Sequence, residues 1–182
     1  MTMDLDPKST FDTFVVGPAN RLASAAAKRA AESPGTAYNP LFIYSASGLG
    51  KSHILMAVAH HASRMNEQLR ARYQTLEGFL QELGDALEAG DRDGLRDTYR
   101  NLDILLMDDV QFLAGQPEAQ EMLLATLDSL TGSESQIVLA SDRPPADILG
   151  DVMGQMHRRV ILIDRRDEDD PPTRALHGQR RL

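Results

Sequence analysis

The sequence predicts an α/β fold in which helices cover both faces of a five-stranded parallel sheet, with residues 41–44 at its centre. The apolar run 41–44 passes through a glycine- and serine-rich turn, 45–52, directly into helical sequence. A second apolar run, 102–107, ends in Asp108 and Asp109. A parallel strand that is buried on both faces delivers acidic groups in this way at its carboxyl edge. Together these runs predict a three-layer α/β/α domain.

The first half of the chain is predicted to contain a flexible segment, an extended arm, a helix, a strand and a second helix. Their ranges are 1–10, 11–18, 21–32, 41–44 and 53–61. Asn20 is a good N-cap for the alanine-rich first helix, which stops at 33–35. In the second helix four apolar residues share one face, which we expect to be buried. They are Ile54, Leu55, Val58 and Ala59.

The second half is predicted to continue with strands and helices and to end in a tail. Strands are expected at 70–74, 102–107, 136–140 and 160–163, and helices at 75–90, 91–99 and 117–132. Thr75 and Asp91 are the expected caps of their helices, and Gly90 ends the first of them. Residues 165–182 show no periodicity and are predicted to be disordered, which leaves 11–164 as the folded domain.

Composition excludes several classes of protein. The 182 residues, 42% of them hydrophobic, suit one soluble domain with a sizeable core. The absence of cysteine excludes disulfides, thiolate metal sites and cysteine nucleophiles. No apolar run approaches the about 18 residues that span a bilayer, and 1–10 lacks a signal-peptide core, so we expect a cytoplasmic protein without membrane contact. The net charge of -8 confines any nucleic-acid contact to a local basic strip.

Residues 45–52 nearly match the phosphate-binding loop, which requires glycine, four free positions and then Gly-Lys-Ser or Gly-Lys-Thr. Ser45 stands in place of the first glycine, where serine would be penalised if the position needs a positive φ. Gly48 and Gly50 let backbone N–H groups turn inward around a polyphosphate, next to the positive end of the following helix. Lys51 would reach the outer phosphates, and Ser52 supplies the hydroxyl that binds magnesium in such loops.

This loop predicts a P-loop NTPase fold that binds ATP or ADP together with Mg²⁺. The nucleotide-binding residues expected from the loop are Ser47, Gly48, Leu49, Gly50, Lys51, Ser52 and His53. Asp108 is the expected second magnesium ligand, acting through water, and Asp109 is expected to polarise the attacking water. Asp142 follows the strand 136–140, where it would sense the terminal phosphate or orient the water, although a turn or a helix cap is an alternative.

Several segments carry a resemblance to a known family. They are FDTFVVGPANRLA at 11–23, AYNPLFIY at 37–44, GLGKSH at 48–53, YRNLD at 99–103, MDDVQFLAG at 107–115 and SDRPP at 141–145. Together they resemble the AAA+ ATPase domain of the bacterial chromosomal replication initiator DnaA. They follow the family order over about 11–148. The resemblance implies an AAA+ fold in which Val15, Val16 and Arg21 lie near the adenine and Asp142 is the sensor residue.

The resemblance also implies partners. The helices within 75–99 resemble the family's insertion that contacts single-stranded DNA inside an ATP-dependent helical oligomer. We therefore expect ATP, weakly bound single-stranded DNA, and further copies or a related initiator as partners.

The sequence departs from the family pattern after residue 148. The family expects an arginine-finger box, a further strand, a helical lid with a second sensor arginine, and a helix-turn-helix domain. Residues 156–160 stand near the box, where Arg158 falls at about the spacing of the finger, and the expected lid and DNA-reading domain are absent from the sequence. We expect at most slow hydrolysis and no sequence-specific binding to duplex DNA.

Two functions are consistent with these features. The first is an ATP-binding domain that acts in the initiation of chromosomal replication, with its nucleotide state controlling assembly on DNA. The alternative is a non-hydrolysing regulatory module that binds nucleotide and a partner initiator. Intact Asp108 and Asp109 favour the first, and the missing lid and finger box favour the second. The measured turnover of ATP, compared with its binding, would separate them.

Overall fold

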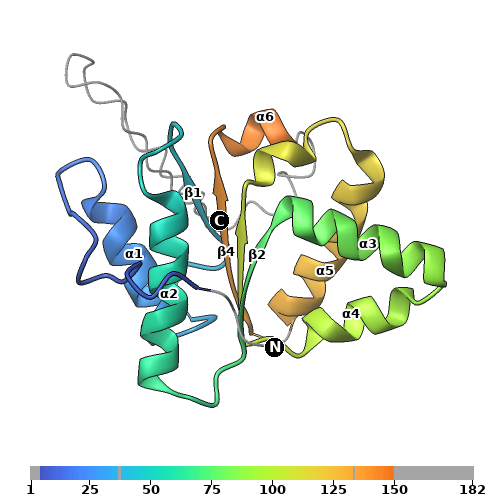
Figure 1. Cartoon of the computed structure of the whole chain (residues 1–182), viewed down its shortest axis with the longest axis horizontal. Helices are drawn as coiled ribbons and strands as arrows, with labels where there is room; N and C mark the ends of the chain where they lie inside the picture. Colours follow the sequence, from blue (N-terminus) through green and yellow to red (C-terminus); the bar gives the residue numbers. More distant parts are fainter. Residues whose placement is uncertain (1–4, 37, 133, 150–182) are drawn as a thin grey trace, which may run out of the picture.

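A computed structural model describes residues 5–36, 38–132 and 134–149. In this part of the chain a four-stranded parallel sheet lies between two layers of helices (Figure 1). The strands are β1 (Leu41–Tyr44), β2 (Ala71–Thr75), β3 (Ile104–Asp108) and β4 (Gln136–Ser141), in the order β1-β4-β3-β2. All three strand pairings are parallel, and Thr75 is in register with Asp108. The predicted α/β class and parallel sheet are confirmed.

Helices cover both faces of the sheet. They are α1 (Arg21–Glu32), α2 (Lys51–Met65), α3 (Leu76–Ala89), α4 (Arg92–Arg100), α5 (Pro117–Gly132) and α6 (Pro145–Leu149), with a 3-10 helix η1 (Val110–Leu113) after β3. Figure 1 shows α1 and α2 on one side of the strands and α3, α4 and α5 on the other. The three layers expected from the sequence are therefore present, and none of the described helices is long and apolar enough to cross a lipid bilayer.

Alternate residues of each strand enter two separate cores. On the side of α1 and α2 the core includes Ile43, Leu106 and Val138, and on the other side it includes Phe42 and Leu105. Because both faces of the sheet are covered, the strands need apolar side chains in both directions, and this need produces the continuous apolar runs seen in the sequence. β2 is the exception, since its residues are only partly buried at the edge of the sheet.

Two expectations about the sheet are corrected. The predicted count of five strands becomes four in the described residues, and the predicted strand 160–163 lies outside them. β1, predicted to be central, is an edge strand of this described sheet, where it pairs only with β4. The expected positions of the two strands nearest to β1 are confirmed, because β4 lies beside β1 and β3 is one strand further away. The predicted tail, 165–182, also lies outside the described residues.

The expected caps of the two helices after β2 are confirmed. The Thr75 hydroxyl accepts a hydrogen bond from the N–H of Gly78, and the Asp91 carboxylate accepts one from the N–H of Gly94. Gly90 ends α3 with a left-handed φ of 70°. Satisfying the free N–H groups of a helix start stabilises it by about 1 kcal/mol per cap.

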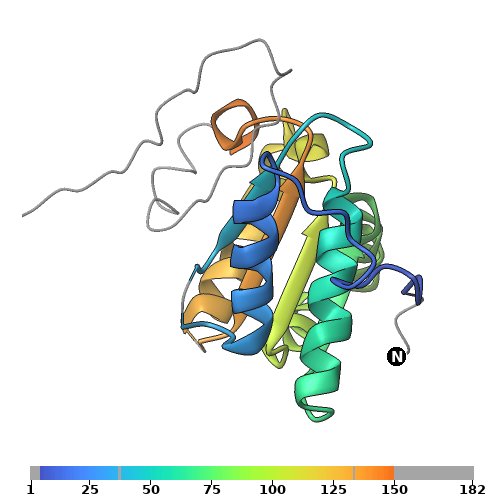
Figure 2. The ribbon, with the colours of Figure 1, turned by 90° about the vertical axis from the view of Figure 1, so that its left-hand side faces the viewer.

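The N-terminal segment differs from expectation. Residues 11–14 form turns rather than an extended arm, and the segment before α1 runs across α2 (Figure 2). Within the range predicted to be flexible, Leu5 packs against the core and Thr10 is buried. Asn20 does not cap α1 with its side chain, because its amide donates to the carbonyl of Val15 and accepts from the N–H of Gly17. These bonds close the turn that leads into α1.

Candidate functional site

The loop between β1 and α2 bends at two glycines. Gly48 and Gly50 have φ angles of 80° and 89°, which residues with a side chain rarely adopt. A Cβ atom on Gly50 would also lie 2.8 Å from Cε2 of Phe14. Gly50 is the N-cap residue of α2, so the loop leads directly to backbone N–H groups that have no partner inside the helix. Such groups, at the positive end of the helix, suit an anion.

Ser45 replaces the first glycine of the motif without strain. In the described part of the chain the non-glycine residues with positive φ are Asp109 and Glu134, so Ser45 has an ordinary backbone conformation. Its N–H donates to the carbonyl of Ser141 at 3.2 Å, which extends the pairing of β1 with β4. The penalty considered for this serine therefore does not arise.

Lys51, the first residue of α2, folds back onto the loop. Its Nζ donates to the carbonyl oxygens of Ser45 at 2.9 Å and of Ala46 at 3.0 Å, and the residue is only 9% exposed. No carboxylate of the described residues lies within 4.0 Å of this ammonium. A buried cation held by neutral carbonyl groups alone is well suited to attract an anion into the loop.

Asp108 ends β3 at the same edge of the sheet. The residue is 1% exposed, and its carboxylate accepts hydrogen bonds from the N–H of Asp109 at 2.9 Å and from the Tyr73 hydroxyl at 3.0 Å. The Ser52 side chain lies close enough to the Tyr73 phenol to affect its pKa. Tyr73 on β2 is therefore a neighbour of both residues predicted to hold magnesium, the serine of the phosphate loop and the acid that ends β3.

The surroundings keep the Tyr73 phenol protonated. Burial raises its pKa above the usual 10.0, and the charge of Asp108 and the hydrogen bond to it raise it further. The neighbouring Ser52 side chain opposes this shift in pKa without cancelling it. The phenol is therefore a hydrogen-bond donor to Asp108 at any physiological pH.

Gln111 connects the other two predicted acids. Its Nε2 donates to Asp109 Oδ1 at 3.0 Å, and its Oε1 accepts from the N–H of Asp142 at 3.3 Å. Asp109 is half-buried with a left-handed φ of 58°, and Asp142 is exposed. The two acids thus lie on either side of one amide at the carboxyl edge of the sheet. Arg158, the predicted finger, lies outside the described residues.

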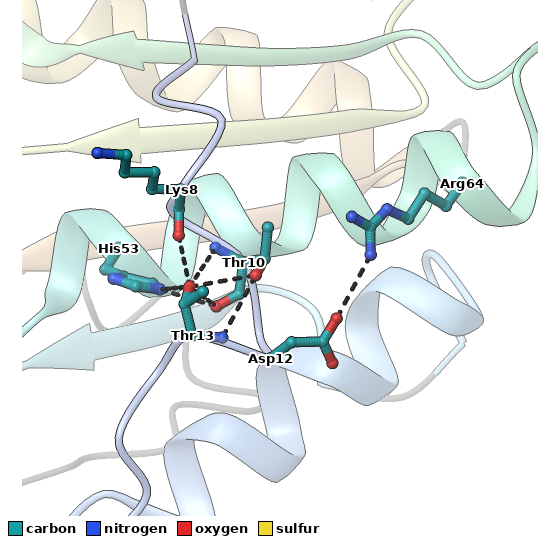
Figure 3. A network of polar contacts seen from close by, with 6 residues as sticks. All are labelled: Lys8, Thr10, Asp12, Thr13, His53 and Arg64. Atoms are coloured by element: carbon teal, nitrogen blue, oxygen red, sulfur yellow. Dashed lines mark hydrogen bonds and ion pairs between the residues drawn. The ribbon is translucent and has the colours of Figure 1, made fainter.

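His53 faces the N-terminal segment. Its Nε2 lies 2.8 Å from the carbonyl of Thr10 and 3.3 Å from the hydroxyl of Thr13, in the network that Figure 3 shows. Its ring also stacks at a tilt on Phe14, with 5.2 Å between the ring centroids. The structure therefore gives this histidine contacts that hold the segment before α1 against α2.

The residues expected near an adenine are on the surface next to this segment. Val15 is 85% exposed, Val16 is half exposed, and Arg21 is exposed at the start of α1. In the loop, Ser47 is exposed and Leu49 is half-buried. Exposed apolar residues beside a nucleotide loop are consistent with a surface that a base covers.

A magnesium ion would find only part of its ligands here. No group of three or more histidine or acidic side chains that could hold a metal is present among the described residues. The exposed Ser52 and the buried Asp108 supply oxygen, the ligand type that magnesium prefers, and phosphate oxygens and water normally complete such a site. The residues present therefore fit a magnesium ion that arrives with a nucleotide.

Sequence reasoning missed Tyr73 and Gln111. Tyr73 lies in a strand read only as a weak apolar pattern, and its partners come from α2 and β3, far away in the chain. Gln111 carries no sequence signal of its own beyond its place two residues after Asp109. The one sequence feature that pointed to Tyr73 was a tyrosine in a predicted strand next to the strand that ends in Asp108.

Comparisons with known proteins agree with one another. The family model described as the bacterial DnaA ATPase domain matches residues 5–160. The chromosomal replication initiator protein DnaA of Thermus thermophilus is 50% identical over 145 residues, which are 80% of this chain and 33% of that protein. The DnaA of Deinococcus radiodurans is 50% identical over 144 residues, 79% of this chain and 31% of that protein. The chain thus spans about a third of the length of these relatives.

Solved structures give the same result. Domain III of the Thermotoga maritima replication initiation protein DnaA matches with a TM-score of 0.83 and 39% identity, over 91% of this chain and 70% of that one. A replication initiator DnaA bound to AMPPCP and single-stranded DNA matches with a TM-score of 0.82 and 35% identity, over 88% of this chain and 50% of that one. The DnaC helicase loader, at 13% identity and a TM-score of 0.71, shares the fold.

Proposed function

This chain belongs to the bacterial DnaA ATPase domain family, and on that premise we propose that it binds ATP and ADP with Mg²⁺ and acts in the initiation of chromosomal DNA replication. One observation carries the proposal. At one edge of the sheet, a loop with two left-handed glycines and a buried Lys51, which has no carboxylate partner among the described residues, meets Ser52 and the buried Asp108. We place this function in the bacterial cytoplasm, where chromosomal replication takes place.

The polyphosphate would occupy the bend of the loop. Lys51 would exchange the carbonyl groups of Ser45 and Ala46 for phosphate oxygens, a stronger charge-assisted contact. The N–H groups at the start of α2 and of residues 47–50 would donate to the same anion. Ser52 and Asp108 would hold the magnesium ion, which neutralises phosphate charge when it is bound.

The base would lie against the segment before α1. Val15 and Val16 offer exposed apolar surface, and Arg21 lies at the start of the neighbouring helix. His53 contributes by holding this segment in place through Thr10 and Thr13. Its role in binding is therefore to fix the wall of the base pocket, with no direct phosphate contact required.

Hydrolysis is proposed to be slow. Asp109 would orient the attacking water and Asp142 would respond to the terminal phosphate, with Gln111 setting the distance between them. Arg158 is the proposed finger that acts on the nucleotide of a neighbouring copy. Where hydrolysis depends on a finger supplied by a neighbour, its absence costs about 10³ to 10⁵ in rate, so turnover should depend on assembly.

Single-stranded DNA is the proposed ligand of α3 and α4. A DnaA structure similar to this chain is described as bound to AMPPCP and single-stranded DNA. Arg92 and Arg96 are exposed on α4, and the net charge of -8 leaves few other places for a phosphate backbone. Binding should be weak and should fall steeply with salt, because counterion release supplies most of it. Anisotropy with a labelled single strand, run beside a duplex of equal length, measures this preference.

Calorimetric titration with ATP and ADP in Mg²⁺ tests the nucleotide proposal. Lys51→Ala should abolish measurable binding, because it removes the cation from the loop. Lys28→Ala is the matched control, since Lys28 is an exposed lysine on α1, and it should bind as the unaltered protein does. Folded, unaltered protein that binds neither nucleotide would overturn the proposal. Binding without turnover, even when the protein assembles, would favour the regulatory module.

A further inference from the structure

Tyr73 is a neighbour of both residues proposed to hold magnesium. Its hydroxyl donates to Asp108 Oδ2 at 3.0 Å, and the Ser52 side chain lies close to the same phenol. Asp108 Oδ1 is occupied by the N–H of Asp109 at 2.9 Å. Each carboxylate oxygen therefore has one donor of its own, which fixes the rotation of the carboxylate.

The contact follows from the register of the sheet. β2 and β3 are parallel, and Thr75 is opposite Asp108, so Tyr73 lies two residues before the end of β2 on the same edge. Its long side chain extends toward the carboxyl end of β3, where Asp108 lies, while its ring packs against the core on the side of α1 and α2. A shorter residue at this position would leave Asp108 without its second donor.

We propose that Tyr73 is a positioning residue for magnesium, orienting the Asp108 carboxylate toward the ion that Ser52 would also hold. The proposal rests on the proposed nucleotide function. Hydrogen bonds behind a metal ligand fix its orientation, and their loss typically costs 10- to 100-fold in metal affinity. Tyr73 itself would contact neither the nucleotide nor the ion.

A purely structural role for Tyr73 makes a different prediction. Such a tyrosine would contribute to folding stability and leave the dependence on magnesium unchanged. The chain contains a suitable control, because Tyr99 also donates its hydroxyl to a carboxylate, Glu82 Oε2, at 2.8 Å. Tyr99, on α4, is 1% exposed and lies in the opposite core, where its ring packs edge-on against Phe79 of α3.

The test measures how magnesium changes the affinity for a fluorescent ATP analogue, mant-ATP, in the full chain. Affinity is measured in EDTA and across a Mg²⁺ titration for the unaltered protein and for Tyr73→Phe, Tyr99→Phe and Asp108→Asn. Tyr73→Phe keeps the ring and should leave affinity in EDTA unchanged, while the Mg²⁺ midpoint rises by about tenfold or more. Tyr99→Phe should leave both quantities unchanged.

A double variant shows whether Tyr73 acts through Asp108. Residues in one hydrogen-bond network have non-additive effects, so Tyr73→Phe combined with Asp108→Asn should have the Mg²⁺ midpoint of Asp108→Asn alone. An unchanged or lower midpoint in Tyr73→Phe, with Asp108→Asn impaired, would overturn the inference and leave the proposed function standing. Equal shifts in Tyr73→Phe and Tyr99→Phe would also overturn it. Absence of mant-ATP binding by the unaltered protein would overturn both.

Discussion

Tyr73 and Tyr99 donate their hydroxyls to carboxylates on opposite sides of β2. Among the described residues, a cationic side chain also contacts the carboxylate in the Tyr99 pair but not in the Tyr73 pair. Tyr99 donates to Glu82, whose other oxygen accepts from the Arg72 guanidinium. The same guanidinium stacks on the Tyr99 ring, 4.7 Å from its centroid. Tyr73 donates to Asp108, and no cationic side chain of the described residues lies within 4.0 Å of that carboxylate.

The difference separates a structural contact from a binding site. A carboxylate taken out of water needs an opposite charge as well as hydrogen bonds to offset its desolvation. Glu82 has that charge within the fold, so its cluster joins α3 and α4 to β2. Asp108 is more deeply buried and has only neutral donors, so it is the carboxylate of the two that gains from an added cation.

Removing the Arg72 guanidinium from its contact with Glu82 and Tyr99 should cause the largest loss in the free energy of unfolding. Arg72→Met would leave the half-buried Glu82 without a counter-charge and would remove the stacking on Tyr99. The side chains of Arg72 and Glu82 are 16% and 32% exposed, so we expect a loss of about 2 kcal/mol rather than the 3–5 kcal/mol of a fully buried pair. Urea denaturation measures it.

The control for this change is an exposed ion pair. Arg64 lies 3.5 Å from Asp12, with side chains 66% and 85% exposed, and Arg64→Met should cost less than about 0.5 kcal/mol. If the two arginine variants lose equal stability, the Arg72 cluster is no more than a surface contact and the comparison with Asp108 fails.

Neutralising each carboxylate should then distinguish the two pairs. Glu82→Gln should lower stability by about 1 kcal/mol, because Arg72 loses its charged acceptor. Asp108→Asn should change it by less than that in magnesium-free buffer, since the relief of a buried charge offsets one weakened hydrogen bond. Thermal unfolding in EDTA compares the two variants.

Ligand addition sharpens the same contrast. A ligand that binds only the folded state stabilises it by about 2.7 kcal/mol at 100 times its dissociation constant. ATP with Mg²⁺ should therefore raise the melting temperature of Glu82→Gln as much as that of the unaltered protein, and that of Asp108→Asn by less. A larger loss of this response in Glu82→Gln would contradict the assignment of the two sites.

The sequence predicted those features that depend on neighbouring residues. The caps at Thr75 and Asp91, the stop at Gly90 and the acid-tipped strand each have a local signal, and the structure confirms them. Asn20 is a good helix-capping residue type, but its side-chain amide bonds to Val15 and Gly17 instead of capping α1. A local signal therefore does not always decide the local structure.

The features that the sequence did not predict depend on which strands become neighbours. Tyr73 meets Asp108 only because β2 pairs with β3, and Gln111 meets Asp142 only because η1 lies beside the end of β4. Neither pairing has a signal within a few residues of sequence. The residues that bind phosphate could be predicted, whereas those that orient them could not.

A third carboxylate, Asp103, pairs with an arginine whose side chain is 58% exposed, and it gives the smallest expected effect of the three. Asp103 precedes β3 and accepts from the backbone N–H of Arg70 at 2.8 Å and from its Nε at 3.2 Å. Burial acts to raise the pKa of Asp103, but the hydrogen bonds and charge of Arg70 outweigh it and lower the pKa below 3.8. The charged form is therefore favoured by folding.

The sign of the pH dependence follows from this lowered pKa. The stabilisation is complete above the unfolded-state value and is lost as pH falls through the folded-state value. Because the side chains of Arg70 and Asp103 are 58% and 35% exposed, Asp103→Asn should cost only about 0.5 kcal/mol at pH 7, and this difference from the unaltered protein should be smaller at pH 3. Asp85→Asn, which also removes one charge, at an exposed acid on α3, is the control variant. Urea denaturation at both pH values measures the two variants, and a difference for Asp103→Asn that grows as pH falls would show that a hydrogen bond, and not charge, links it to Arg70.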